Sequence, residues 1–305
     1  MKKNSEYKTN FPHKIQWKYP EAIVDCNWLK DKINKEEIRI YDCTTYLHYT
    51  DENPSKPYDV CSGNEGYKKG HIPGSAYLDL QNQLSEPNSS YSFTLPKLEK
   101  LADCFKKCGI GKPYHIILYS RNGLQWATRV WWMLYILGYK KVSILNGGFA
   151  EWLRLGLPVD RNSTYFAKSN FSVEKITDIF VHKEQVLKAI NDKSCILVNA
   201  LTEDIHTGQS SRYGRPGRIP NSLNIPFHRF LDPETGKFIK PSEALRIFKE
   251  KRISPDKNII NYCGGGIAAT LDCFILYQLG YPNLFIYDNS MSEWAMDPSL
   301  PMETD

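Results

Sequence analysis

The most distinctive chemical feature of the chain is one cysteine, Cys263, between two contrasting segments. A short apolar run over 259–262 precedes it, three glycines follow it, and a helix-prone segment extends over 271–279. This order predicts strand, tight loop and helix, with the thiol near a helix N-terminus, where unpaired backbone N–H groups favour the thiolate. The glycines would let the loop approach a bound anion without Cβ clashes. The pattern fits a nucleophile, and from spacing alone it fits equally well an inert buried cysteine beside a helix cap.

The bulk composition is typical of a soluble globular protein of one large domain or two ordinary ones. The 305 residues are 41% hydrophobic and 24% charged, and 39 basic against 34 acidic residues give a formal charge of +5. This charge is too mild to indicate a nucleic-acid partner. The longest apolar stretch, 130–137, is far shorter than the roughly 20 residues of a membrane span, and the polar N-terminus lacks the apolar core of a secretory signal. We therefore expect a cytoplasmic protein without nucleic-acid or membrane partners.

The remaining cysteines give little indication of special chemistry. Their spacing is not that of a disulfide framework, and a chain of this length needs no covalent staples. Cys104 and Cys108 lie four residues apart in a predicted helix and would share one face, but no second nearby pair completes a zinc site. We expect ordinary packing for this pair and no bound metal.

The chain repeats itself in order. Residues 70–75 (GHIPGS) return as 217–222 (GRIPNS), 137–139 (LGY) return as 279–281, and 146–152 (NGGFAEW) return as 288–294 (DNSMSEW). The offsets are 147, 142 and 142 residues. Three ordered matches at nearly one spacing indicate a tandem duplication.

Each half alternates short β-rich runs with helical patterns. The runs are 38–42, 116–119 and 142–145 in the first half and 196–199, 259–262 and 284–287 in the second; helical patterns cover 28–33, 95–108 and 125–137. This alternation predicts an α/β fold in which each half is a mostly parallel sheet flanked by helices on both faces. The aperiodic segment 157–172 is predicted to link a domain over 17–156 to a domain over 173–305.

The duplication singles out Cys263 among the cysteines. The same offset places it opposite Ser120 or Arg121, where 116–119 forms the corresponding strand-to-loop step without a thiol. Ligands of parallel sheets bind beyond the carboxyl ends of the strands, which is where Cys263 is predicted to lie. Both copies keep the framework, but only one keeps a candidate nucleophile. This predicts one working site, in the second copy, and a first copy that supports it.

At this point the segments resemble a known family, the tandem-domain rhodaneses, which are thiosulfate and 3-mercaptopyruvate sulfurtransferases. The resemblance runs from about Trp17 to the C-terminus. Its marks are 70–74 (GHIPG), 129–133 (RVWWM), 146–149 (NGGF), 224–227 (NIPF), the Cys263 loop, and 293–298 (EWAMDP) with 300–301 (LP). These marks are more specific for the family and its fold than for a substrate.

The resemblance implies two rhodanese-like domains, a catalytic C-terminal one and an inactive N-terminal one with Ser120 at the cysteine position. It implies that Cys263 takes sulfane sulfur from a small anionic donor, thiosulfate or 3-mercaptopyruvate, as a persulfide. The sulfur then passes to a thiol or cyanide acceptor, with a thioredoxin-like protein as one candidate. No metal or organic cofactor is implied. The residues implied to cradle the persulfide with backbone N–H groups are Gly264, Gly265, Gly266, Ile267 and Ala268.

The chain departs from the family where the donor binds. Thiosulfate-type members usually carry basic side chains in the loop, and mercaptopyruvate-type members tend to have a serine at the position of Gly265. The usual Asp-Ala-Arg segment is replaced by Asn199-Ala200-Leu201, and Ile205 stands where a further arginine is expected. The main donor-binding side chains of the family are therefore absent.

Three arginines in a glycine- and proline-rich loop are candidate replacements. We favour Arg212 and Arg215 for a bidentate grip on a carboxylate or sulfonate, while an ordinary solvated basic loop remains an equal alternative. Arg218 occupies the motif position of His71 and is expected to be structural. For His71 we expect hydrogen bonds that order its own loop.

Two other functions remain to be weighed. A cysteine phosphatase would need an arginine six positions after the cysteine, and Ala269 stands there. A non-catalytic module that carries sulfur or senses redox state beside a protein partner would explain the missing arginines. It would not explain the preserved cysteine–glycine loop.

Overall fold

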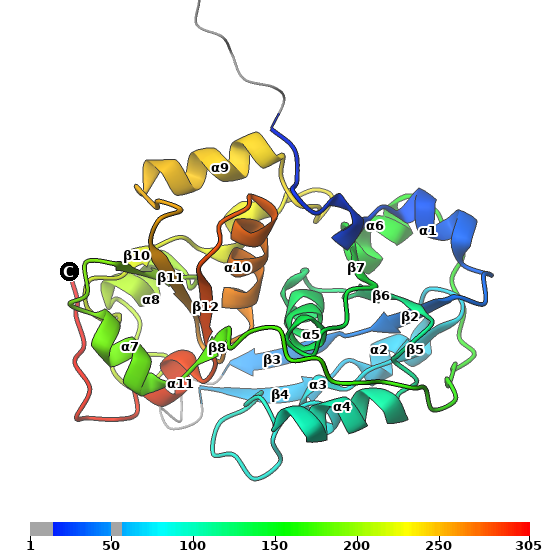
Figure 1. The fold of residues 1–305 in the computed structure, drawn as a ribbon, viewed down its shortest axis with the longest axis horizontal. Helices are drawn as coiled ribbons and strands as arrows, with labels where there is room; N and C mark the ends of the chain where they lie inside the picture. The colour runs from blue at the N-terminus through cyan, green and yellow to red at the C-terminus, as the bar shows by residue number, and fades with distance from the viewer. Residues whose placement is uncertain (1–14, 50–56) are drawn as a thin grey trace, which may run out of the picture.

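The computed structural model describes residues 15–49 and 57–305 and contains two copies of one α/β arrangement (Figure 1). The first copy has a parallel five-stranded sheet in the order β1-β7-β6-β2-β5. Its strands are β1 (Ile23–Val24), β2 (Ile38–Asp42), β5 (Ser75–Tyr77), β6 (His115–Tyr119) and β7 (Val142–Leu145). Its helices are η1 (Pro20–Ala22), α1 (Cys26–Lys32), α2 (Asn64–Lys69), α3 (Leu80–Gln83), α4 (Leu98–Lys107), α5 (Gln125–Ile136) and α6 (Gly148–Arg154).

The second copy has a parallel sheet in the equivalent order, β10-β9-β11-β12-β8. Its strands are β8 (Phe180–Val181), β9 (Cys195–Asn199), β10 (Leu223–Asn224), β11 (Asn258–Tyr262) and β12 (Leu284–Tyr287). Its helices are α7 (Lys183–Ala189), α8 (Glu203–Thr207), η2 (Phe227–Phe230), α9 (Pro241–Glu250), α10 (Ala268–Gln278) and α11 (Ser290–Trp294). The predicted fold class, two parallel sheets flanked by helices, is confirmed, and all six predicted strands are present.

Continuous burial explains why these runs form central strands. In β2, Ile40 faces a cluster with Leu29 of α1 and Trp152 of α6, whereas its neighbour Tyr41 faces a cluster with Phe105 of α4. Since successive side chains point to opposite faces and both faces are covered by helices, every position of the strand is buried. An apolar run without alternation is the expected sequence of such a strand.

The duplication is visible in individual hydrogen bonds. In the first copy, the Tyr119 hydroxyl at the end of β6 lies 3.0 Å from Ser75 Oγ. In the second, the Tyr262 hydroxyl at the end of β11 lies 2.7 Å from Ser222 Oγ. The two strands that lead into the loops of interest are therefore fixed at the same point by the same pair of residue types.

The two copies meet along α5 and α10, at corresponding positions of each. Thr128 Oγ1 and Thr270 Oγ1, equivalent by the 142-residue offset, lie 2.7 Å apart, and Trp132 Nε1 donates to the Thr270 carbonyl at 3.0 Å. All three residues are buried. Helix α10, which follows the Cys263 loop, thus packs directly on the first copy.

A second pair of equivalent contacts crosses the interface in both directions. Asn146 Oδ1 of the first copy accepts the Phe238 N–H at 2.9 Å. Asp288 Oδ2 of the second copy accepts the Leu95 N–H at 2.7 Å. Because Asn146 and Asp288 are equivalent positions, the copies hold each other through a nearly twofold exchange of hydrogen bonds from backbone N–H groups to side-chain oxygens.

The two motif positions expected to be structural are structural. His71 is fully buried, and its Nδ1 and Nε2 lie 2.7 and 3.2 Å from the carbonyls of Tyr67 and Asn162. Its equivalent, Arg218, pairs with the carboxylates of Glu303 and Asp305. His71 therefore ties its loop to the segment that follows the first domain, and Arg218 ties its loop to the C-terminal residues of the second.

Among the elements that were not predicted is the antiparallel hairpin of β3 (Thr45–Tyr49) and β4 (Tyr58–Ser62). It leaves the first copy after β2 and extends toward the second copy (Figure 1). Both strands include polar, exposed positions such as His48 and Asp59, so they lack the apolar runs on which the strand predictions depended.

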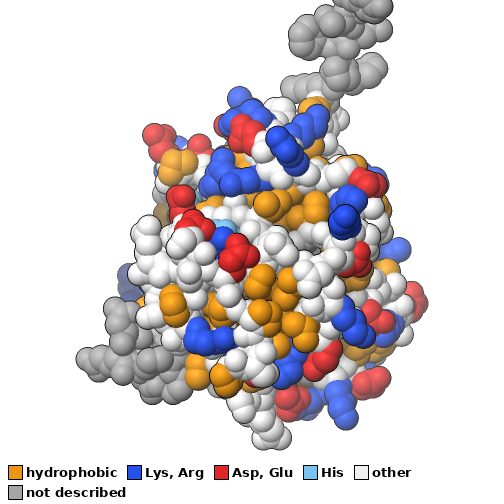
Figure 2. All heavy atoms as spheres, turned by 90° about the vertical axis from the view of Figure 1, so that its left-hand side faces the viewer, with side chains coloured by type: hydrophobic (Ala, Val, Ile, Leu, Met, Phe, Trp, Pro, Cys, Tyr) orange, Lys and Arg blue, Asp and Glu red, His pale blue; other side chains and the backbone are white. Residues whose placement is uncertain are grey.

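The exterior carries mixed charge. On the face in Figure 2, the described basic and acidic side chains lie interspersed over most of the surface. Among the described residues, no helix is long and apolar enough to cross a membrane. Nor do three His, Cys, Asp or Glu side chains in that part of the chain gather closely enough to hold a metal ion.

Candidate active site at Cys263

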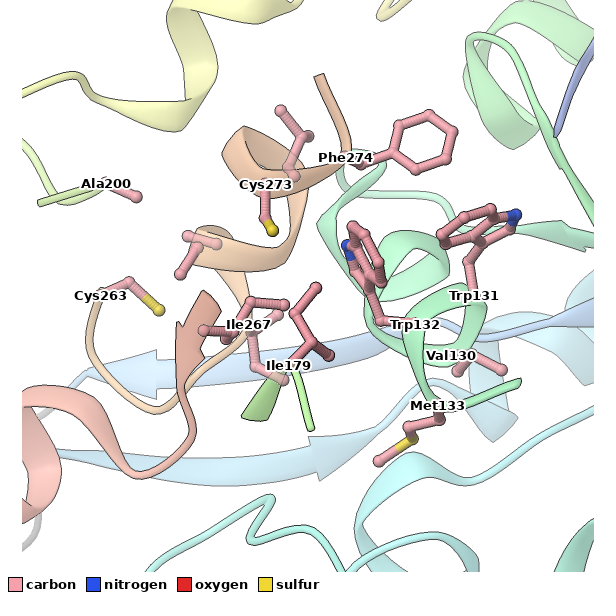
Figure 3. Close-up of a cluster of buried hydrophobic side chains, with 14 of the residues drawn as sticks. Val130, Trp131, Trp132, Met133, Ile179, Ala200, Cys263, Ile267, Cys273 and Phe274 are labelled. Carbon is pink, nitrogen blue, oxygen red and sulfur yellow. The ribbon is translucent and has the colours of Figure 1, made fainter. Parts of the chain in front are cut away.

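Cys263 lies at the carboxyl end of β11, at the start of the loop that leads into α10. Only 2% of the residue is exposed. Its side chain points to the inside of the loop, toward Ile267 (Figure 3). The predicted strand–loop–helix step is confirmed, and the thiol is buried within the curve of the loop.

The loop is fixed by the start of α11. The Cys263 N–H donates to Ser290 Oγ at 3.0 Å, and that hydroxyl donates to the Tyr287 carbonyl at 2.7 Å. The carbonyls of Cys263 and Gly264 accept the N–H groups of Met291 and Ser292 at 3.0 and 2.8 Å. The first two residues of the loop are thus fixed by hydrogen bonds to the start of α11.

The loop also keeps free hydrogen-bond donors. Within the described part of the chain, the backbone N–H groups of residues 264–267 have no hydrogen-bond acceptor. Gly266 has a left-handed φ of +70°, and a Cβ there would lie 2.1 Å from the Asp288 carbonyl oxygen, so only glycine fits. Successive free N–H groups at the start of a helix form a concavity that favours an anion.

An arginine of the first copy holds this loop. Arg129 is fully buried in α5, and its guanidinium donates to the Gly266 carbonyl at 3.1 Å. The same group donates to Asp288 Oδ1 and the Phe93 carbonyl, both at 2.6 Å. The copy without a thiol therefore contributes directly to the geometry of the loop that has one.

A cavity of about 80 Å³ lies beside Cys263, between the two copies. The first copy contributes the hairpin side chains Leu47, Tyr49 and Tyr58 together with Phe93, Gln125 and Trp126, and the second contributes Leu201, Tyr213, Phe227 and the loop. Among these described lining residues, none carries a charge. The cavity is aromatic, with hydroxyl, amide and backbone N–H groups as its polar elements.

Arg212 and Arg215, the two arginines favoured from the sequence, have different surroundings in the structure. The Arg215 guanidinium donates to the carbonyls of Trp294, Ala295, Asp297 and Leu300 at 2.6–2.8 Å. This corrects our expectation for Arg215. Four of its five N–H donors bind backbone carbonyls of the C-terminal segment, which leaves no pair of donors for a bidentate grip on a substrate.

Arg212 lies nearer the cavity. Its guanidinium lies over the ring of Tyr49, 4.2 Å from the ring centre, and Tyr49 lines the cavity. Arg212 itself is not among the lining residues. Leu201, at the family's arginine position, does line it. Arg212 thus adds positive charge behind an aromatic ring, and its role in donor binding stays a prediction.

The corresponding loop of the first copy is closed by its own side chains. Ser120 is 2% exposed, and its hydroxyl donates to the Gly123 carbonyl at 2.5 Å. Arg121 Nε donates to Asp42 Oδ2 at 3.1 Å, and the guanidinium lies 4.0 Å from the ring centre of Phe149. Burial raises the pKa of Asp42, although Arg121 and Thr44 act against the shift. A self-contained ion pair occupies this loop.

Other cysteines are in surroundings that suppress nucleophilicity. Burial, with a contribution from Glu151, raises the pKa of Cys26 to about 12, and burial beside Cys104 raises that of Cys108 to about 11. Burial likewise raises the pKa of Cys43 and of Cys273. These four thiols are protonated near neutral pH and are poor nucleophiles.

Three residues at the site were not identified from the sequence: Arg129, Tyr58 and Tyr213. Arg129 stood within a family mark, but nothing in its spacing indicated that it reaches Gly266 in the other copy. The tyrosines lie 205 and 50 residues before Cys263, in irregular or hairpin segments, so no periodic pattern connects them to the thiol.

Comparison with known proteins matches the model of the rhodanese-like domain to residues 25–155 and again to 183–297. The matched ranges lie within the two predicted domains, 17–156 and 173–305.

Among curated proteins, the chain is 31% identical to 3-mercaptopyruvate sulfurtransferase of Escherichia coli K12, over 92% of this chain and 97% of that protein. It is 30% identical to 3-mercaptopyruvate sulfurtransferase of Mus musculus, over 90% and 92%. Among solved structures, SseA of Escherichia coli, described as a 3-mercaptopyruvate sulfotransferase of rhodanese fold, superposes with a TM-score of 0.74 at 28% identity. That match covers 88% of this chain and 98% of SseA.

Proposed function

Since this chain belongs to the rhodanese family as a two-domain member, we propose that it is a sulfurtransferase whose second copy carries out the chemistry at Cys263. The observation that carries the proposal is the buried thiol at the start of a loop that leads into α10, in which four successive N–H groups have no acceptor among the described residues. The relatives named as sulfurtransferases support the reaction class. The small cavity supports a small donor.

The proposed reaction has two half-reactions. The Cys263 thiolate attacks the outer sulfur of thiosulfate or the sulfur of 3-mercaptopyruvate, and a new S–S bond forms. The bond between that sulfur and the donor breaks, and its electron pair leaves with sulfite, or with the enolate of pyruvate, which takes up a proton. A thiol or cyanide then attacks the outer sulfur of the persulfide and releases the Cys263 thiolate. No external oxidant or reductant is required.

The loop's part in this reaction is electrostatic. Its free N–H groups would donate hydrogen bonds to the persulfide sulfur and to charge that develops during transfer. Arg129 would keep the loop in this shape through the Gly266 carbonyl. Neither step requires a metal or an organic cofactor. The acceptor would enter from the aromatic cavity, and a thioredoxin-like protein thiol is one candidate.

The test is thiocyanate formation from cyanide with thiosulfate or 3-mercaptopyruvate as donor, for the native protein and for Cys263→Ser. We expect turnover with at least one donor and none above background in the variant, whereas Cys104→Ser turns over like the native protein. Full activity in Cys263→Ser would refute the proposal. Uptake of one sulfur per chain without repeated turnover would instead support a sulfur-carrier module that acts with a protein partner.

A further inference from the structure

At two of the three glycine positions in the loop, the backbone conformation does not require glycine. Gly266 has a left-handed φ, but Gly264 and Gly265 do not, so side chains at these two positions would be free of backbone strain. Their need for glycine must come from the space around them.

That space is occupied by two tyrosine hydroxyls. A Cβ built on Gly264 would lie 2.0 Å from Tyr213 Oη, and a Cβ built on Gly265 would lie 2.6 Å from Tyr58 Oη. Contacts under about 3 Å are not found for real Cβ atoms, so each hydroxyl excludes a side chain from the loop. The hydroxyls stand where loop side chains would otherwise begin.

The two tyrosines come from different copies. Tyr58 is the first residue of β4, in the hairpin that extends from the first copy, and Tyr213 lies between α8 and β10 in the second. They are 4% and 3% exposed, and both line the cavity beside Cys263. Buried hydroxyls are normally hydrogen-bonded, because an unpaired one costs free energy.

Neither hydroxyl is well satisfied in the described part of the chain. Tyr58 Oη has only Ser292 Oγ at 3.4 Å, and Tyr213 Oη has no hydrogen-bond partner there. A tyrosine hydroxyl without a good protein partner, on a side chain that lines the cavity beside Cys263, is poised to bond to a ligand at that loop. Burial raises the pKa of both phenols, so they are hydrogen-bond donors throughout the neutral range.

We propose that Tyr58 and Tyr213 are the donor-binding residues of this site, and that their hydroxyls donate hydrogen bonds to the sulfur group held at Cys263. The inference rests on the proposed sulfur transfer and specifies how a cavity without charged lining binds an anionic donor. Two neutral donors, with the loop N–H groups, would take the place of cationic side chains. Glycines at 264 and 265 are then the residues that admit these hydroxyls.

Other groups also lie near the thiol, and the test must separate their effects from those of the two hydroxyls. Tyr49 lines the cavity with Arg212 behind its ring, and the Arg129–Asp288 ion pair lies beyond Gly266. Phenylalanine substitutions at 58 and 213 leave all of these in place and remove one hydroxyl each. Tyr281→Phe is the matched control. Tyr281 is buried in the second copy, as Tyr213 is, and its hydroxyl donates to the Ile253 carbonyl, away from the loop.

The first measurement is the pH dependence of Cys263 alkylation by iodoacetamide, followed by peptide mass, which requires no sulfur donor. In Tyr58→Phe and Tyr213→Phe we expect the midpoint pH of alkylation to rise, because the thiolate loses a hydrogen bond. Where turnover exists, kcat/KM for the donor should fall about tenfold to a hundredfold per hydroxyl, the range for a bond to a charged group. Tyr281→Phe should change neither. Unchanged alkylation and unchanged kcat/KM in both variants would overturn the inference.

A second measurement tests the geometry through stability alone. Gly265→Ala should lower the urea midpoint in the native background and cost much less in Tyr58→Phe, where the clashing oxygen is gone. Gly264→Ala should remain costly in Tyr213→Phe, because ring carbons of Tyr213 also lie 2.6 and 2.9 Å from the added Cβ. Equal cost of Gly265→Ala in both backgrounds would contradict the placement of Tyr58, whatever reaction the protein catalyses.

Discussion

The first and second copies share a framework but differ at one strand end. The register pairs Asp42 with Tyr119 in the first copy and Asn199 with Tyr262 in the second, so Ser120 corresponds to Cys263 and Arg121 to Gly264. In the first copy, the arginine fills the loop and pairs with Asp42. In the second, glycine leaves the loop open to the cavity and its hydroxyls. The same backbone thus carries either a loop closed by its own ion pair or a loop that opens on a cavity.

The first copy, whose own loop is closed, also contributes to the site in the second copy. Its hairpin supplies one wall of the cavity, and its Arg129 bonds the Gly266 carbonyl. At the 142-residue offset, the position equivalent to Arg129 is Leu271. The second copy therefore has no arginine there that could make the corresponding contact to the loop of the first copy. We infer that the duplication became asymmetric in both directions: one copy keeps the nucleophile, and the other positions its loop.

The sharpest test of this asymmetry makes matched changes in the two loops. Cys263→Ser should lower sulfur-transfer turnover at least about a thousandfold, as expected when a nucleophile is removed. Ser120→Ala should leave turnover within about twofold, because its hydroxyl bonds only within its own loop. Steady-state assays of both variants measure the contrast, and a large loss in Ser120→Ala would refute it.

Arg129→Leu tests the contact that crosses between the copies. Because it leaves Asp288 buried without its partner, we expect a loss of about 3–5 kcal/mol in the free energy of unfolding. Turnover should fall as well, since the Gly266 carbonyl loses its donor. Urea denaturation measures the first effect, and Lys68→Ala, at an exposed ion pair, is the control with no resolvable change. Native stability in Arg129→Leu would contradict this assignment.

Arg121→Leu makes a comparable change inside the closed loop. We expect it to cost about 1–3 kcal/mol of stability, because Asp42 loses a partner but, with its pKa already raised by burial, can take up a proton. Sulfur transfer should remain within about twofold of native at a temperature where the variant is folded. If turnover falls as far as in Arg129→Leu, the first loop is coupled to the catalytic one and the comparison fails.

The smallest effect concerns acid stability of the interface. Hydrogen bonds from Arg154 and from Lys237 of the second copy lower the pKa of Glu151 from 4.5 to about 2. A pKa lowered by folding stabilises the protein fully above about pH 4.5, and the contribution is lost as pH falls toward about 2. Glu151→Gln should therefore flatten the dependence of the urea midpoint on pH in this window. Lys237→Met should flatten it less, since Arg154 remains; an unchanged slope in Glu151→Gln would contradict the pairing.

Much of the framework could be predicted from sequence because buried parallel strands have a direct signature. The run 284–287 is apolar throughout, and 38–42 is rich in β-forming residues although it includes Arg39 and Asp42. The structure makes each of them a strand with helices over the sheet. The position of Cys263 followed from the duplication, since only one copy of the strand-to-loop step ends in a thiol. Local composition and internal comparison were sufficient for both.

The polar surroundings of the thiol could not be predicted in the same way. Arg215 stood in a basic loop suited to an anion, but its partners are backbone carbonyls of a segment about 80 residues later, which sequence does not reveal. Tyr58 reaches the loop only because the hairpin crosses to the other copy. Contacts of this kind depend on how the two sheets are placed, and no spacing rule contains that information.

The most direct test of the central claim is the intact mass of the reduced protein after incubation with thiosulfate and, separately, with 3-mercaptopyruvate, followed by peptide mapping. The account predicts a gain of one sulfur atom located on Cys263, its loss on addition of cyanide, and no gain in Cys263→Ser. Sulfur on another cysteine, or an equal gain in Cys263→Ser, would contradict the assignment of the second copy as the working site.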